Sequence, residues 1–236
     1  MRKYNRVLIK LSGESLMGDQ SFGIDAERLN EYAVQIAELA GEGTELGIVI
    51  GGGNIFRGLE GAGKGFDRVK GDQMGMLATT INGISLQSSL ENMGVKARVF
   101  TAIKMEPFAE YYIKDRVMES LNQGYVNIFV GGTGNPYFTT DSAAALRALE
   151  IQADVLLKGT RVDGVYSEDP EKHPHATKFT SLTYNMAIEK QLKVMDMTAF
   201  ALCRDNDLPI VVFNVHKPGQ MKRAIYEDHV GTIVHR

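Results

Sequence analysis

Residues 6–53 read RVLIKLSGESLMGDQSFGIDAERLNEYAVQIAELAGEGTELGIVIGGG, and this stretch decides the fold class. Its ends contain continuous apolar runs, RVLIKL from Arg6 and LGIVIG from Leu46, which are typical of strands buried on both faces. Asp25 is a plausible N-cap for the residues between them, which place apolar side chains on one helical face: Leu29, Ala33, Ile36, Ala37 and Ala40. A strand, a helix and a strand at this spacing predict parallel strands joined by a right-handed crossover.

The same alternation continues along almost the whole chain. Further apolar runs predict strands at residues 95–100, 126–131, 154–159 and 209–215. Helical patterns predict helices at residues 72–93, 110–122, 142–151, 196–206 and 219–227, and Gly94 is expected to stop the first of these. The expected fold is therefore α/β, a three-layer αβα sandwich with a mainly parallel central sheet.

Residues 160–192 interrupt this pattern because they are polar and rich in turn residues. Asp163-Gly164 is a turn signal, so we expect a hairpin followed by a loop, inserted in the second half of the chain. No repeat, low-complexity segment or long linker divides the sequence. A single domain spanning residues 1–236 is therefore predicted.

The composition excludes several classes of protein. The 236 residues carry a net charge of −3 with both signs scattered, so no basic stripe indicates nucleic-acid binding. Cys203 is the only cysteine, which excludes an internal disulfide, and its apolar neighbours predict burial. No apolar run approaches the length of a membrane span, and the N-terminal run is too short for a signal peptide. We expect a cytoplasmic protein that binds no membrane.

Four predicted strands are followed by unusual loops. They read KLSG from Lys10, GGGNIFRG from Gly51, GGTGNPYFTTD from Gly131 and KGTRVDGVY from Lys158. Glycine lets the backbone approach an anion closely, and ligands bind beyond the carboxyl ends of parallel strands. Together with the cations Lys10, Arg57 and Lys158, these loops predict a site for a polyphosphate and a second anionic group.

Several of these polar residues also have a structural interpretation. Lys10 and Arg57 could extend into solvent, and Asp141 and Asp196 stand where helix N-caps belong, although capping is compatible with catalysis.

Other candidates are weaker. Asp163 and Asp169 adjoin Gly or Pro and are better interpreted as turn residues. The five histidines lack metal-ligand spacing, which argues against a histidine metal site or base. No protein nucleophile motif is present, so phosphoryl transfer to an acceptor that is already an anion fits best, with Lys10 and Lys158 flanking the transferred group.

The stretch 58–66, GLEGAGKGF, nearly matches a phosphate-binding loop, G-x-x-x-x-G-K-[ST]. It places Gly65 where a hydroxyl should hold magnesium, and it does not join a strand directly to a helix. We therefore interpret it as a loop tip, and a phosphate contact by Lys64 is not favoured.

Five segments together resemble the amino acid kinase family and, within it, the bacterial uridylate kinases. They are KLSGE from Lys10, GGGNIFRG from Gly51, GDQMGMLAT from Gly71, GTGNPYFTTDSAA from Gly132 and LLKGTRVDGVYSEDP from Leu156. The resemblance covers residues 6–234 and implies an amino acid kinase-like fold. It also implies ATP-dependent phosphorylation of UMP to UDP in pyrimidine synthesis, with residues 1–140 mainly on the nucleoside monophosphate side and residues 141–236 mainly on the ATP side.

The resemblance also implies a role for each site residue. ATP would be bound by Lys10, Leu11, Ser12, Gly13, Gly53, Arg57, Thr160, Tyr166 and Asp169. UMP would be bound by Gly52, Asp72, Thr133, Gly134, Asn135, Pro136, Tyr137, Phe138, Thr139 and Thr140. The catalytic residues would be Lys10, Arg57, Asp141, Lys158 and Asp196. Mg²⁺ would be held mainly by ATP phosphates, so no complete protein metal site is expected.

Members of this family are homohexamers, and many are activated by GTP and inhibited by UTP. The segment matching the one linked to GTP activation comprises Gly18, Asp19, Gln20, Ser21, Phe22 and Gly23. Gln87 and Glu91 stand where some GTP-responsive members carry arginine and histidine, so UTP inhibition is the firmer expectation.

Two other functions would use the same fold. An amino-acid or carbamate kinase would need a cationic or polar pocket for a carboxylate where GTGNPYFTT lies, and that segment has no cation. A non-catalytic nucleotide-binding protein would be favoured by loss of Lys10, Arg57 or Asp141, which are all present.

Overall fold

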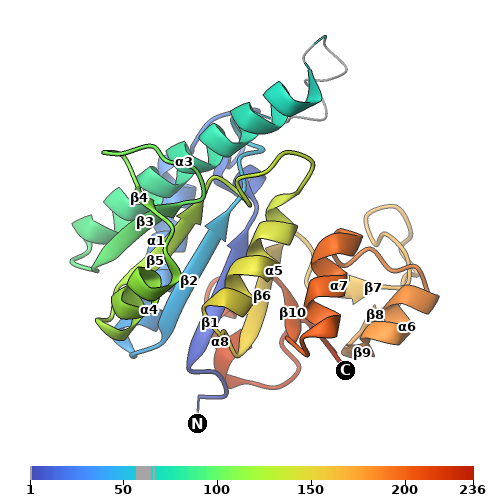
Figure 1. The fold of residues 1–236 in the computed structure, drawn as a ribbon. Coiled ribbons are helices and arrows are strands. Elements are labelled where there is room, and N and C mark those ends of the chain that lie inside the picture. The colour runs from blue at the N-terminus through green and yellow to red at the C-terminus, as the bar shows by residue number, and fades with distance from the viewer. Residues whose placement is uncertain (1, 57–64, 66) are drawn as a thin grey trace.

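The computed structural model describes residues 2–56, 65 and 67–236. Within these residues, the main sheet has nine strands in the order β4-β3-β5-β2-β1-β6-β10-β11-β9 (Figure 1). Their bounds are β1 Arg6–Leu11, β2 Glu45–Ile50, β3 Ala97–Thr101, β4 Glu110–Tyr111, β5 Val126–Val130, β6 Val155–Thr160, β9 Ser181–Thr183, β10 Ile210–Asn214 and β11 Thr232–His235. Every pair of neighbours is parallel except β10 with β11, so the mainly parallel sheet is confirmed.

Helices cover both faces of this sheet, as Figure 1 shows. Their bounds are η1 Gly13–Leu16, α1 Ala26–Gly41, α3 Arg68–Asn92, α4 Lys114–Asn122, α5 Thr140–Glu150, α6 Tyr184–Glu189, α7 Met197–Asp205 and α8 Gln220–Tyr226. Val7, Ile9 and Leu11 of β1 face one core with α1, α3 and α8, whereas Leu8 faces a second core with α4, α5 and α7. The alternation along β1 explains why successive residues from Val7 to Ile9 are all apolar, and the three-layer αβα sandwich is confirmed. Among the described helices, none is both long and apolar enough to cross a membrane.

The six predicted strands are confirmed within one or two residues, but the short strands were missed. A hairpin exists, since β7 Val165–Tyr166 pairs antiparallel with β8 Lys178–Phe179, but residues 167–177 connect its strands and the predicted turn Asp163-Gly164 precedes β7. The rest of residues 160–192 is not only a loop, because β9 joins the main sheet beside β11 and is followed by α6. Strands of two or three residues show no measurable hydrophobic period, so only long-range pairing defines them.

Two predicted helix starts, those of α3 and α4, were wrong by four residues. Helix α3 begins at Arg68, not at Asp72, because the Asp67 side chain accepts a hydrogen bond from the Lys70 amide as the N-cap. Helix α4 begins only at residue 114, since residues 110–111 form β4, and α5 begins at residue 140. The predicted stop of α3 is confirmed by Gly94, which has a φ of 76°.

Helix α3 lies unusually close to the sheet. A Cβ on Gly83 would lie 2.4 Å from Cγ1 of Val130 in β5, and a Cβ on Gly52 would lie 2.8 Å from the Gly75 carbonyl oxygen. Both distances are shorter than van der Waals contact, so these positions require glycine. This approach brings α3 against the loop that follows β2.

We predict that Gly83→Ala destabilises the protein by about 1–3 kcal/mol, the usual cost of overpacking a core. Gly75→Ala in the same helix is the matched control, because an added Cβ there meets no atom within 4 Å. The control should be neutral or slightly stabilising, since alanine is the better helix former. Urea unfolding measures both changes, and equal effects of the two substitutions would contradict the packing argument.

Candidate active site

The four predicted loops do come together. They follow β5, β2, β1 and β6, which are consecutive neighbours in the sheet and mutually parallel. Their carboxyl ends therefore lie side by side at one edge. A hydrogen bond joins the loops after β1 and β2 directly: the Gly51 amide donates to the Leu11 carbonyl oxygen at 3.0 Å.

Two lysines and one aspartate form the centre of this edge. Lys10 and Lys158 are register partners on the adjacent strands β1 and β6. Asp141, in the first turn of α5, pairs with both: its Oδ1 lies 3.0 Å from Lys10 Nζ and its Oδ2 lies 2.5 Å from Lys158 Nζ. The three side chains are only 12–15% exposed, and Lys158 also donates to the Val194 carbonyl oxygen at 2.8 Å. We call Lys10, Asp141 and Lys158 the charge triad.

The triad shifts the pKa values of its members. Burial acts to raise the pKa of Asp141, but attraction by Lys10 and Lys158 outweighs it, so the pKa lies below its ordinary value of 3.8. The pKa of Lys158 is lowered, chiefly by burial and also by repulsion from Lys10. Oδ1 of Asp141 lies within ion-pair distance of Lys10, but the geometry of this contact is not that of a hydrogen bond. Among the described residues, this oxygen has no hydrogen-bond partner. That oxygen can therefore accept one more contact.

Asp196 makes its hydrogen bonds at the starts of α5 and α7, and it acts on Lys158 through its charge alone, which favours the protonated ammonium. It caps α7 by accepting from the Ala199 amide at 3.0 Å, and it also accepts from the hydroxyls of Thr139 and Ser142. Thr139 in turn accepts from the amides of Asp141 and Ser142, so Thr139, not Asp141, is the N-cap of α5. Asp196 therefore fixes two helix starts, and the positive end of the α5 dipole is held at the site.

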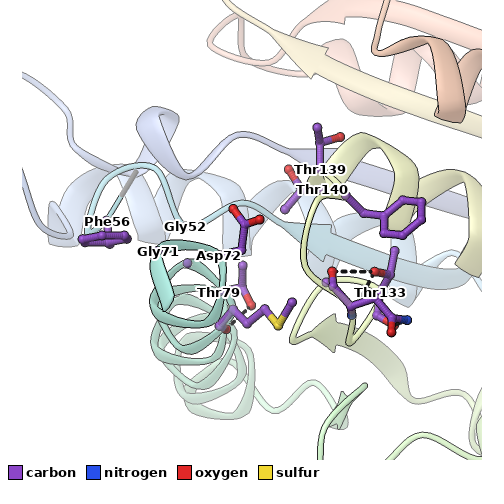
Figure 2. A pocket seen from close by; sticks show the side chains of 13 residues that line it. Gly52, Phe56, Gly71, Asp72, Thr79, Thr133, Thr139 and Thr140 are labelled. Atoms are coloured by element: carbon purple, nitrogen blue, oxygen red, sulfur yellow. Dashed lines mark hydrogen bonds between the residues drawn. The ribbon is translucent and has the colours of Figure 1, made fainter. Parts of the chain in front are cut away.

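A first cavity opens between α3 and the loop after β5, and Figure 2 shows Asp72 and Thr79 on one side with Thr133, Thr139 and Thr140 on the other. We call it the acceptor cavity. Seven predicted UMP-binding residues line it: Gly52, Asp72, Thr133, Asn135, Phe138, Thr139 and Thr140. The predicted residues Gly134, Pro136 and Tyr137 belong to the same loop but are not among its lining residues.

Asp72 connects the two sides of this cavity. Its carboxylate accepts from Arg68 Nε at 2.8 Å and from the Tyr137 amide at 2.8 Å. The Arg68 guanidinium also lies over the Tyr137 ring. Arg68 was missed by the sequence prediction, although it stands four residues before Asp72 and would have been found by the helical (i, i+4) charge pattern.

Thr79 was also missed. Its hydroxyl accepts from the Gly131 amide at 2.8 Å and donates to the Met76 carbonyl oxygen, which ties α3 to the end of β5. No sequence pattern marks a buried threonine for such a role.

A second cavity lies between residues 160–173 and residues 191–194. We call it the donor cavity, because the predicted ATP-binding residues Thr160, Tyr166 and Asp169 line it. The Tyr166 hydroxyl donates to Asp163 Oδ1 at 2.6 Å, while Asp169 accepts from the Glu171 amide, as in a turn. The other predicted ATP-binding residues lie elsewhere: Lys10 and Leu11 end β1, Ser12 and Gly13 begin η1, and Gly53 follows β2.

The charge triad stands between the two cavities. Thr140 lines the acceptor cavity and immediately precedes Asp141. Val194 lines the donor cavity and accepts a hydrogen bond from Lys158. Each cavity therefore adjoins the charge triad, although no triad residue is among the lining residues of either cavity.

Some predicted residues cannot be placed. Arg57, Lys64 and all of residues 58–66 except Gly65 lie outside the described residues. Cys203 is buried, as predicted. Across residues 2–56, 65 and 67–236, no cluster of three or more His, Cys, Asp or Glu side chains could hold a metal ion.

The candidate effector residues lie in the segment between η1 and α1 and on α3. Gly18 and Gly23 adopt left-handed φ values of 58° and 94°, and Phe22 between them is largely exposed. Gln87 on α3 donates to Glu91 and to the Ala97 carbonyl oxygen.

Comparisons with known proteins agree with this geometry. The sequence model of the Amino acid kinase family matches residues 5–214. A curated protein named uridylate kinase from Bacteroides thetaiotaomicron is 59% identical over 235 residues, and one from Parabacteroides distasonis is 60% identical, each covering 100% of both chains. The crystal structure of a UMP kinase from Bacillus anthracis superposes with a TM-score of 0.96 at 41% identity, covering 99% of this chain and 97% of that one.

We predict that Asp141→Asn lowers the free energy of unfolding by about 3 kcal/mol at pH 7, because it leaves two buried lysines without their counter-charge. The pKa of Asp141 is lowered in the folded state, so its stabilising contribution is present above the unfolded value of 3.8 and is lost as the pH falls through the folded pKa. The difference between wild type and variant should therefore shrink below pH 3.8. Urea unfolding at pH 7, 4 and 3 measures it, and a difference independent of pH would be contrary to this account.

Proposed function

The chain belongs to the amino acid kinase family and is a kinase, and we propose that it is a uridylate kinase that reversibly transfers the γ-phosphoryl group of ATP to UMP, giving UDP and ADP. The names of its relatives, uridylate kinase and UMP kinase, support UMP as the acceptor. The observation that carries the proposal is the charge triad between two cavities, which matches a reaction that moves a charged group from a donor to an acceptor.

The reaction requires positioning and charge neutralisation more than proton removal, since the UMP phosphate is already a nucleophilic anion. Lys10 and Lys158 would stabilise the negative charge on the transferred group from two sides. Asp141 would orient both ammonium groups, and Asp196 would hold the α5 N-terminus toward the phosphates. Arg57, predicted to bridge phosphates, lies outside the described residues.

We propose that UMP occupies the acceptor cavity. The Asp72 carboxylate has capacity beyond its bonds to Arg68 and Tyr137, so it could accept hydrogen bonds from ribose hydroxyls. Thr139, Thr140 and the backbone around Asn135 would recognise the uracil edge.

ATP would occupy the donor cavity, with Thr160, Tyr166 and Asp169 along its adenosine part. Its phosphates would reach the backbone of Lys10 to Gly13 and of Gly53. This arrangement supports a division of labour between residues 1–140 and 141–236, although residues 10–13 and Gly53 contribute to the ATP side from the first part.

The described donor groups fit a magnesium ion that is held mainly by phosphate oxygens. Mg²⁺ prefers oxygen ligands and is often bound by one carboxylate and substrate phosphates. Asp141 Oδ1 is a buried carboxylate oxygen that has no hydrogen-bond partner among the described residues. Bound there, Mg²⁺ would neutralise phosphate charge.

Self-association is part of the proposal. Leu77, Ile81 and Ile84 of α3 are 52%, 50% and 37% exposed and lie on one helical stripe. An exposed apolar stripe of this kind favours self-association in which another copy of the chain covers it. The resemblance leads us to expect a homohexamer. A cytoplasmic location and a role in pyrimidine synthesis rest on the resemblance alone.

Effector responses are proposed as follows. UTP would inhibit by competing for the uridine part of the acceptor cavity. GTP activation is less supported, because Gln87 and Glu91 pair with each other and neither side chain is cationic.

A comparison of phosphoryl acceptors separates this function from its rivals. With Mg-ATP and UMP, CMP, aspartate or N-acetylglutamate offered separately in a coupled ADP-release assay, UMP alone should support rapid turnover. Turnover of an amino acid would favour an amino-acid kinase, which would need a cation that the described acceptor-cavity lining lacks. ATP binding without turnover of any acceptor would favour a non-catalytic nucleotide-binding protein.

We also expect Lys10→Ala to lower kcat at least ~100-fold while the protein stays folded, the scale for removing one donor to a developing oxyanion. Lys96→Ala is the control, since Lys96 precedes β3 at the opposite end of the strands. A near-normal rate for Lys10→Ala would remove Lys10 from the mechanism.

UTP inhibition should be relieved by raising UMP. Initial rates at several UTP concentrations should share one maximal rate and differ in the apparent KM for UMP. A maximal rate that falls with UTP at saturating UMP would instead indicate a separate UTP site.

A further inference from the structure

We propose that Asn54 and Asn82 are positioning residues for phosphoryl transfer, because their paired side-chain amides hold three parts of the site in one arrangement. The three parts are the loop at residues 10–13, the loop at residues 51–53 and helix α3. This inference rests on the proposed function, since it assigns a role in that reaction.

The two amides form a closed pair in the interior. Asn82 is fully buried and Asn54 is 2% exposed. Asn54 Nδ2 donates to Asn82 Oδ1 at 3.0 Å, and Asn82 Nδ2 donates back to Asn54 Oδ1 at 2.7 Å. The second N–H of Asn54 reaches the Gly23 carbonyl oxygen at 2.9 Å, and that of Asn82 reaches the Gly51 carbonyl oxygen at 2.7 Å. Every N–H of both amides is thus used.

The orientation of each amide is fixed by a backbone carbonyl. A carbonyl oxygen can only accept, so the nitrogen of Asn82 must face Gly51 and the nitrogen of Asn54 must face Gly23. With both nitrogens placed in this way, the remaining donors and acceptors match each other. Turning either amide over would put oxygen against oxygen in a buried place, which is costly. The pair therefore allows one arrangement of its surroundings.

Those surroundings include the loops at residues 10–13 and 51–53, which we call the phosphate loops because the proposed function places the ATP phosphates there. A Cβ on Gly13 would lie 2.5 Å from the Gly51 carbonyl oxygen and 2.6 Å from Asn54 Oδ1, so the first loop rests directly on the pair. Gly51 belongs to the second loop and is held by Asn82. Asn54 also holds Gly23 through two hydrogen bonds. Its backbone carbonyl oxygen accepts from the Gly23 amide, and its side-chain amide donates to the Gly23 carbonyl oxygen. These bonds connect the candidate effector residues to the asparagine pair.

Asn82 transmits this arrangement to the acceptor cavity. It lies on α3, the helix that also carries Asp72 and Thr79. One buried pair thus sets the separation between the loop that starts with Lys10 and the helix that lines the acceptor cavity. A shift of about 1 Å between reacting groups is enough to cost a large factor in rate.

The chain contains a matched control at Asn127. It is also fully buried, and it donates to the Val117 carbonyl oxygen at 3.0 Å while accepting from Ser120 at 2.7 Å. These partners lie in α4, and Asn127 stands near the amino end of β5, away from the carboxyl ends of the strands. Its loss should affect stability without moving the phosphate loops.

The test compares Asn82→Asp with Asn127→Asp at pH 8. Both variants keep the shape of the side chain but replace a buried N–H donor by oxygen, so both should lower the Tm. Folding is verified by circular dichroism, and rates are taken below both Tm values at saturating UMP and Mg-ATP. We expect Asn82→Asp to lower kcat by about 10- to 100-fold, and Asn127→Asp to keep a kcat close to that of the wild type. Asn54→Asp, which removes the donor to Gly23, serves if Asn82→Asp does not fold.

The positioning role would be overturned if a folded variant of the pair (Asn82→Asp or Asn54→Asp) had the same kcat as Asn127→Asp, whether both kcat values are high or both are low. The wild-type rate with UMP tests the proposed function separately. Should the wild type bind Mg-ATP without turnover, the comparison is made on Mg-ATP affinity by calorimetry. The positioning role then predicts weaker binding by the pair variant than by Asn127→Asp, and equal affinities would overturn it.

Discussion

Two lysines facing each other across neighbouring strands are the constraint on which this site depends. Lys10 and Lys158 share a register position on β1 and β6, and two buried ammonium groups so placed repel each other. Asp141 makes the arrangement stable, but only if α5 brings its first turn to the strand ends. Thr139 and Asp196 meet that requirement by capping α5 and α7 together. The result is a concentrated positive site in a chain of negative net charge.

The second requirement of this structure is that backbone segments approach one another closely around the site. Gly13 is packed against Gly51, and Gly52 and Gly83 bring α3 onto the sheet without room for a Cβ. A glycine-rich sequence can therefore serve packing as much as anion binding. Of the triple glycine, Gly52 has packing contacts that alone explain its identity, whereas a Cβ on Gly51 would lie 3.0 Å from the Gly13 amide nitrogen, a tight contact.

The long apolar elements could be predicted from sequence because their signal is local. The six central strands and the caps Asp25 and Asp196 follow from runs and spacings that the nearby chain contains. Helix α3 gave a weaker signal, since it buries glycine, threonine and asparagine rather than a leucine stripe, and its start was placed four residues late. Strands β9 and β11 were missed because their stability comes from pairing with each other and with β10.

The sequence by itself determined the αβα class, the four loops at one edge and the identity of the two lysines and their aspartate. Periodicity and glycine placement encode these features directly. Only the tertiary structure decided that Asp141 pairs with both lysines, that Arg68 pairs with Asp72 while Thr79 lines the acceptor cavity, and that Asn54 meets Asn82 beside the loops at residues 10–13 and 51–53. Those contacts join residues far apart in the chain, and a hydrogen bond depends on distance and angle, which no spacing along one sequence records.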